Sequence, residues 1–133
     1  MTQPFRTASG GRIRRDLPLR FTFNGQSLTG YQGDTLASAL LAHGIHLTGR
    51  SFKYHRPRGI LTAGPEEPNA LVTLDRGEGR LIPNTRATTA ELHEGLTAIS
   101  LNAVESLTTP RFTCLPATPR CQAVVPVLRK RIE

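Results

Sequence analysis

The sequence holds few of the residues that usually mark metal sites, membrane spans or disulfide frameworks. Its 133 residues include no tryptophan, one methionine and two cysteines. The cysteines, Cys114 and Cys121, are separated by six residues, a spacing that is not typical of zinc or haem sites. No run reaches the roughly 18 apolar residues that a membrane-spanning helix needs. We therefore expect no metal site and no membrane contact.

The first residues lack the apolar stretch of a secretory signal, so the cytoplasm is the expected compartment. Residues 1–17 are polar, basic and interrupted by glycine and proline, which is typical of a flexible arm. Proline, arginine and cysteine recur after residue 107, and no helix or strand is readable there. We expect an arm at 1–17, one domain at 18–107 and an irregular tail at 108–133.

The charge balance favours cations, since 17 lysines and arginines face 10 acidic residues, for a net charge of +7. Most of these cations are arginines, whose planar guanidinium pairs with carboxylates and phosphates and tolerates burial at interfaces. Such a surface attracts acidic partners, including nucleic acid. The alternative is a solvated surface in which a coding bias has replaced lysine by arginine, and composition leaves both explanations open.

The first predicted elements are a β-hairpin and a short helix. Residues 19–23 alternate apolar and polar side chains, and Asn24-Gly25 is typical of the type I′ turn because both positions need a positive φ. Residues 27–31 form the returning strand. Apolar residues then recur at helical spacing over residues 35–43, with Asp34 as the expected N-cap and Gly44 as the residue that ends the helix.

Later segments predict further strands. Residues 45–54 suit a short strand, beyond which Pro57 and Gly59 exclude regular structure, and residues 69–75 form another strand. Residues 86–100 fit a helix or two strands joined by a turn, and we prefer the strands. This order indicates an α+β fold of the β-grasp type, a mixed sheet packed on one helix. An antiparallel α+β sandwich is the alternative.

One segment, residues 49–60, concentrates cations, aromatic rings and a histidine around a proline. Cations on a loop fixed by proline and glycine bind phosphate or carboxylate at a low ordering cost. In the alternative, Phe52 and Tyr54 are core residues and the arginines are solvated. No catalytic or metal residue is predicted, and Glu66-Glu67 is expected to be a solvated turn. The candidate interface or ligand contacts are Arg50, Lys53, Tyr54, His55, Arg56 and Arg58.

Five segments together resemble the N-terminal part of the α subunit of heterotetrameric sarcosine oxidase. Two of them, GRSFKYHRPRGI at 49–60 and AGPEEPNALV at 63–72, are long and of unusual composition. The others lie at 21–25, 33–42 and 87–96, so that the resemblance covers about 18–107. It implies a β-grasp domain of the 2Fe-2S ferredoxin type inside an oxidoreductase.

The resemblance also implies cofactors and partners. The family enzyme oxidatively demethylates sarcosine to glycine with oxygen and tetrahydrofolate, and its full complex contains FAD, FMN and NAD. The remainder of the α subunit and a β subunit would be the partners of this chain. The chain lacks the dinucleotide fingerprint G-x-G-x-x-G, so we expect it to bind none of these cofactors alone.

The sequence departs from the cluster pattern of such a domain. A plant-type cluster needs C-x4-C-x2-C and a distant fourth cysteine. The loop expected to carry this run, residues 46–59, contains no cysteine, so we expect no iron–sulfur cluster. Residues 108–133 do not resemble the family's continuation, and a truncated or frame-shifted gene would explain them.

Three functions remain after these observations. The first is a non-catalytic N-terminal domain or fragment of a sarcosine oxidase α subunit, without a complete active site, whose segment 49–60 contacts the rest of the complex. The second is an arginine-rich nucleic-acid-binding module, which we rank below the first. The third is a 2Fe-2S electron-transfer domain.

Overall fold

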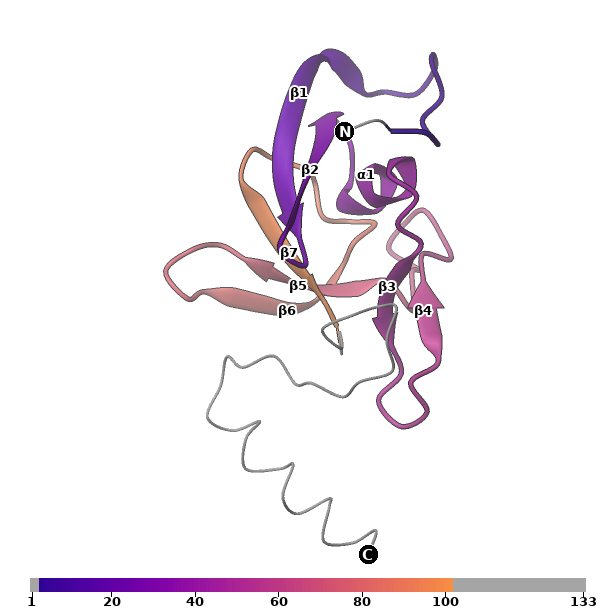
Figure 1. Cartoon of the computed structure of the whole chain (residues 1–133), viewed down its shortest axis with the longest axis vertical. Helices are drawn as coiled ribbons and strands as arrows, with labels where there is room; N and C mark the ends of the chain where they lie inside the picture. Colours follow the sequence, from indigo (N-terminus) through magenta and orange to yellow (C-terminus); the bar gives the residue numbers. More distant parts are fainter. Residues whose placement is uncertain (1–2, 102–133) are drawn as a thin grey trace, which may run out of the picture. The chain divides into compact units, whose positions relative to one another are not determined.

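The structure, a computed structural model, describes residues 3–101 (Figure 1). The predicted tail at 108–133, with its two cysteines, lies outside the described residues. Seven strands and one helix form within residues 3–101. They are β1 (Arg14–Phe23), β2 (Gln26–Gln32), α1 (Leu36–Ala42), β3 (Leu47–Arg50), β4 (Pro57–Gly59), β5 (Leu71–Asp75), β6 (Leu81–Arg86) and β7 (Leu96–Ser100).

The β1–β2 hairpin confirms the turn predicted at Asn24-Gly25. The two residues have φ values of 50° and 80°, and Phe23 pairs with Gln26 on either side of them. Strand β1 begins at Arg14, before the predicted start of the domain, because Arg14 pairs with Gln32 across an irregular register. The hairpin is therefore longer than the alternating pattern indicated.

A five-stranded sheet in the order β2-β1-β7-β5-β6 forms the body of the domain. Its first and last strands in the sequence, β1 and β7, are neighbours and run parallel, whereas the other pairs are antiparallel. Figure 1 shows α1 beside the β1–β2 end of this sheet. A mixed sheet with one helix packed on it is the predicted β-grasp arrangement, and the parallel central pair excludes the antiparallel sandwich.

The helix ends agree with the prediction at one end only. The N-cap is Thr35 and not Asp34, because Thr35 and Ser38 exchange side-chain-to-backbone hydrogen bonds of 3.0 and 3.2 Å in a capping box. At the other end, Gly44 has a φ of 77°, as predicted for the residue that ends the helix.

The core lies between the helix and the sheet, and its members alternate along the strands. Burial along β7 and β5 follows a strict period of two, so that one face of each strand enters the core. The largest fully buried apolar side chains are those of Phe21, Leu28, Leu36, Leu40 and Val72.

The later elements correct two expectations and add one strand that was not predicted. Pro57 and Gly59 do not exclude regular structure, because they bound the short strand β4, which pairs with β3. Edge strand β6 was not predicted, and its side chains are mostly exposed. In segment 86–100 the second strand, β7, is confirmed, but irregular chain with buried alanines precedes it in place of the first strand.

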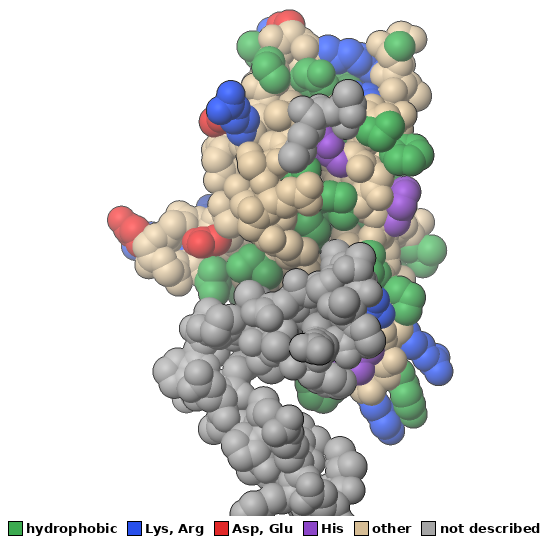
Figure 2. All heavy atoms as spheres, in the orientation of Figure 1, with side chains coloured by type: hydrophobic (Ala, Val, Ile, Leu, Met, Phe, Trp, Pro, Cys, Tyr) green, Lys and Arg blue, Asp and Glu red, His purple; other side chains and the backbone are tan. Residues whose placement is uncertain are grey.

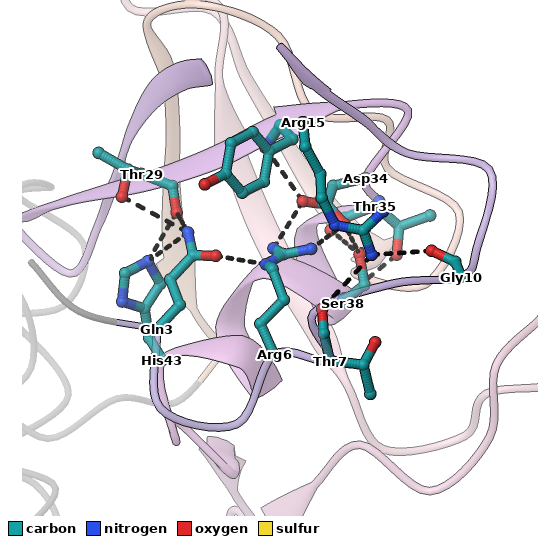
Figure 3. Close-up of polar contacts among 11 residues, drawn as sticks. Gln3, Arg6, Thr7, Gly10, Arg15, Thr29, Asp34, Thr35, Ser38 and His43 are labelled. Carbon is teal, nitrogen blue, oxygen red and sulfur yellow. Dashed lines mark hydrogen bonds and ion pairs between the residues drawn. The ribbon is translucent and has the colours of Figure 1, made fainter. Parts of the chain in front are cut away.

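Residues 3–6, which we call the amino-terminal clip, contact the helix and the hairpin, although we expected a flexible arm there (Figure 3). The Arg6 guanidinium lies 2.7 Å from the Asp34 carboxylate and 5.0 Å from the centre of the Tyr31 ring. The Gln3 side-chain amide donates to the Thr29 carbonyl at 2.6 Å. Asp34 is buried, and its carboxylate accepts hydrogen bonds from Arg6, the Tyr31 amide and the Ser38 hydroxyl, while Thr35 caps the helix.

Candidate functional site

The predicted contact residues lie on a two-stranded hairpin, residues 47–59, which we call the cationic hairpin. It is formed by β3 and β4, which make a separate sheet beside the main one. At its tip, Phe52 is 80 % exposed and Tyr54 is 64 % exposed. The alternative that these two aromatic residues belong to the core is therefore wrong. Figure 2 shows cationic and apolar side chains together at this projecting end.

Two cations flank the exposed tyrosine. The Lys53 ammonium lies 5.2 Å and the Arg56 guanidinium 5.0 Å from the centre of the Tyr54 ring, within the range of cation–π attraction. Neither cation forms an ion pair with a carboxylate within residues 3–101. The tip thus presents an aromatic ring and two charges that can meet an anionic partner.

Hydrogen bonds within the turn hold the tip in one conformation. The Ser51 amide donates to the Arg56 carbonyl, and the Arg56 amide donates to the Ser51 hydroxyl, both at 3.0 Å. The Arg50 guanidinium donates to the His55 carbonyl at 2.8 Å, and His55 itself has a φ of 49°. Arg50 and His55 therefore shape the turn, while Lys53, Tyr54 and Arg56 form its outer surface.

The last predicted contact residue, Arg58, forms hydrogen bonds at the base of the hairpin. Its guanidinium donates to the Asn69 side-chain oxygen at 2.8 Å, and its carbonyl accepts from the buried Thr48 hydroxyl at 3.3 Å. A side chain at Gly59 would place its Cβ 2.5 Å from the His46 carbonyl oxygen. The structure therefore places Arg58 at the base of the hairpin and Arg56 beside Tyr54 at its tip.

A buried carboxylate in the next loop is the feature that the sequence analysis missed. Glu67 is 1 % exposed, whereas we expected Glu66-Glu67 to be a solvated turn. Its Oε2 accepts from the backbone amides of Leu61 and Thr62 at 2.8 and 2.6 Å. Its Oε1 accepts from the amides of Asn69 and Ala70 at 2.8 and 3.1 Å. We call residues 60–70, which fold around this group, the carboxylate loop.

The backbone donors decide the charge state of Glu67. Burial alone would raise the pKa of this carboxyl, but the four amide hydrogen bonds outweigh burial and lower the pKa to about 2. No cation forms an ion pair with Glu67 among the described residues. The carboxylate is thus a permanently charged centre at neutral pH that is stabilised by peptide groups.

Comparison with known proteins assigns the fold a family. Residues 16–103, about two-thirds of the chain, match the family described as the 2Fe-2S iron-sulfur cluster binding domain. This chain belongs to that family. The structure also resembles L-proline dehydrogenase from P. horikoshii, with a TM-score of 0.53 and 23 % identity over 71 % of this chain and 17 % of that chain. At this identity the likeness concerns the fold.

Sarcosine oxidase α subunits are similar in sequence. The subunit from Rhizobium meliloti (strain 1021) is 63 % identical over 103 residues, which are 77 % of this chain and 10 % of that protein. The subunit from Corynebacterium sp. (strain U-96) is 42 % identical over 110 residues, 78 % of this chain and 11 % of that protein. The chain spans about a tenth of the length of these relatives.

The residues of the matched region do not fit the cluster that the family is named after. Iron–sulfur clusters of this type are held by cysteine thiolates, and residues 16–103 contain no cysteine. Among residues 3–101, no group of three or more histidine, cysteine or acidic side chains could hold a metal ion. No helix in this same range is long and apolar enough to cross a membrane.

Proposed function

We propose that the chain acts as the non-catalytic N-terminal domain of a sarcosine oxidase α-type subunit, and that the cationic hairpin docks it onto the remainder of that subunit. The exposed aromatic and cationic tip is the observation that supports docking. The similarity to the α subunits, of which this chain corresponds to about a tenth, supports the choice of partner.

The chemistry of the hairpin tip suits an acidic protein face. Exposed aromatic rings are common anchors in interfaces, and arginine and tyrosine are enriched among the residues that dominate binding energy. Because the turn is already fixed by hydrogen bonds, binding requires little further ordering of the backbone. Residues 35–65 contain no acidic residue, so the partner's carboxylates meet no repulsion from this segment.

The cofactors and substrates belong to other parts of the proposed assembly. FAD, FMN and NAD, together with sarcosine, oxygen and tetrahydrofolate, would be handled by the remainder of the α subunit and by the β subunit. Supporting this division, the chain carries no dinucleotide fingerprint. The domain's contribution would be to position those parts, with the oxidation of sarcosine taking place elsewhere.

The test replaces the corresponding segment of the Rhizobium meliloti α subunit with residues 3–101 of this chain, in the presence of that enzyme's other subunits. The test variant is Tyr54→Ala with Arg56→Ala, which removes the exposed ring and one flanking charge. The matched control, Leu81→Ala with Arg80→Ala, removes one exposed apolar residue and one exposed cation from the β5–β6 end. Assembly is measured by size-exclusion chromatography and flavin content by absorbance.

The proposal predicts that the Tyr54/Arg56 variant lowers the yield of assembled complex at least about tenfold, which corresponds to one strong interface contact. The control should assemble like the unsubstituted chimera. Equal assembly of both variants would refute docking through this hairpin. A separate pull-down of this chain with the isolated remainder of the Rhizobium meliloti α subunit, and with the β subunit, tests the choice of partner. Binding to the β subunit and not to the remainder of the α subunit would show that the assigned partner is wrong.

The nucleic-acid alternative is separated by a titration of this chain with short DNA and RNA. Binding to phosphates would weaken steeply with added salt because counterions are released. Binding that is absent, or equally weak at all salt concentrations, removes this alternative. Steeply salt-dependent binding that Tyr54→Ala with Arg56→Ala abolishes would favour it over docking to protein.

A further inference from the structure

The buried carboxylate of the carboxylate loop selects a register for comparison with an iron–sulfur ligand run. With Glu67, which is 1 % exposed, at the middle position of the C-x4-C-x2-C pattern of plant-type clusters, Thr62 and Ala70 stand at the first and third positions. The loop leads directly into core strand β5, which begins at Leu71. We expected the ligand run at residues 46–59, but the cationic hairpin occupies that segment. The ligand positions of this register lie instead in the next loop, residues 60–70.

A position for the distant fourth ligand lies beside the end of this run. The Ala87 amide donates to the Ala70 carbonyl at 2.8 Å, and both alanines are fully buried. The Ala87 carbonyl accepts in turn from the Ala37 amide in the first turn of α1 at 2.9 Å. Ala87 comes from the segment after β6, far along the chain, as the fourth cysteine of the pattern does.

The group at the centre of this loop has the electrostatic character of a cluster. Thiolates and sulfides are anionic, and hydrogen bonds to the sulfurs are among the factors that set a cluster's potential. In this chain the carboxylate of Glu67 accepts four backbone amide hydrogen bonds from both ends of the loop. The Thr62 hydroxyl lies 3.3 Å from the same carboxylate. The loop thus surrounds an anionic side chain of its own with backbone donors.

We propose that residues 60–70 are the cluster loop of the 2Fe-2S family, and that the Glu67 carboxylate has replaced the cluster as the anion around which this loop folds. In this view Thr62, Glu67, Ala70 and Ala87 occupy the four ligand positions. The loop keeps its shape because the amides have a new acceptor. This inference goes beyond the docking function and does not rest on it.

The first test returns thiols to the four positions in the full chain. Thr62→Cys, Glu67→Cys, Ala70→Cys and Ala87→Cys are combined with Cys114→Ser and Cys121→Ser, so that no other thiol is present. The control carries the same number of cysteines one residue away, by Ala63→Cys, Glu66→Cys, Asn69→Cys and Thr88→Cys. Each chain is incubated anaerobically with iron and sulfide, desalted, and assayed for bound iron, bound sulfide and visible absorbance.

The proposal predicts two irons and two sulfides per chain in the first variant, and a signal in electron paramagnetic resonance after one-electron reduction. The shifted-cysteine control and the chain with serines alone should remain colourless. A folded first variant without a cluster would overturn the assignment of ligand positions. Equal cluster content in the shifted control would overturn it as well, because cysteine count alone would then explain binding.

The second test needs no cysteine and decides the case if the four-cysteine variant does not fold. Glu67→Gln is compared with Glu66→Gln, which changes the exposed neighbouring carboxylate. Hydrogen exchange is followed at the amides of Leu61, Thr62, Asn69 and Ala70. We expect Glu67→Gln to accelerate exchange at these amides about tenfold or more, with Glu66→Gln unchanged. Unchanged protection in Glu67→Gln would refute the anchoring role of the carboxylate.

Discussion

The cationic hairpin and the carboxylate loop follow one another in the chain and place their charges in opposite ways. The hairpin holds Lys53 and Arg56 in solvent beside an exposed tyrosine. The loop encloses the Glu67 carboxylate and satisfies it with backbone amides. The two regions differ in the hydrogen-bond partners that they offer to a charged side chain. In the carboxylate loop, four backbone amides point at the Glu67 carboxylate, whereas the hairpin tip offers no such group of partners to Lys53 or Arg56.

This contrast separates what each region contributes. Removing a group from the carboxylate loop leaves buried donors without an acceptor, which destabilises the folded state. Removing a side chain from the hairpin tip leaves no buried group without a partner, because the tip is already largely exposed to solvent. We therefore expect substitutions in the loop to change the free energy of unfolding, and substitutions at the tip to change binding.

The largest expected effect is that of Glu67→Ala. It leaves four amides without their acceptor, although water can reach part of this loop because Leu61 is 69 % exposed. We expect the free energy of unfolding to fall by about 3 kcal/mol. Urea denaturation followed by circular dichroism measures this change. A loss below that of an ordinary surface substitution would erase the distinction between the two regions.

Acid should act on the same carboxylate. Because the folded-state pKa of Glu67 is about 2 and its ordinary value is 4.5, the stabilisation is complete above pH 4.5 and is lost as the pH falls toward 2. The unfolding free energy of the unsubstituted chain should fall over this interval more steeply than that of Glu67→Gln. Denaturation curves at several pH values compare the two slopes, and parallel slopes would contradict the assignment.

A smaller effect is expected from Thr62→Val, which keeps the side-chain shape and removes the hydroxyl near the Glu67 carboxylate. The backbone amide of this residue still donates to the carboxylate, so one contact of five is lost. We expect a loss of about 1 kcal/mol in the free energy of unfolding. A loss as large as that of Glu67→Ala would mean that the hydroxyl, and not the amides, holds the loop.

The smallest effect on stability is expected at the hairpin tip. Tyr54→Ala removes a side chain that is 64 % exposed and lies beside the exposed cations of Lys53 and Arg56. The free energy of unfolding should change by less than about 0.5 kcal/mol, as for other surface substitutions. The same denaturation assay checks this value. A larger loss would show that the tip supports the fold and would weaken the case for a docking surface.

Sequence patterns predicted the parts of the fold that depend on neighbours along the chain. The turn at Asn24-Gly25 and the end of the helix at Gly44 follow from local backbone requirements, and both are present. Strands β5 and β7 follow from alternation or β-forming composition. Strand β6 was missed because an edge strand buries little, so its side chains need no apolar pattern.

The candidate site was predicted only in part for a similar reason. The cationic hairpin could be found because its composition is unusual in the sequence. The burial of Glu67 could not be predicted, since it depends on backbone amides from both ends of the loop that come together only in the folded structure. Nothing in the sequence distinguishes Glu67 from its neighbour Glu66, so no signal was available before the loop was seen folded.

The amino-terminal clip has a practical consequence for anyone who prepares this domain. A version trimmed to begin at residue 18 would lose Arg6 and leave the Asp34 carboxylate buried without its counter-ion. Trypsin should accordingly cut after the exposed Arg12 well before it cuts after Arg6, whose side chain is 12 % exposed. Affinity tags are best placed ahead of Gln3, because a domain boundary drawn at the trypsin site after Arg12 would remove residues that contact the folded domain.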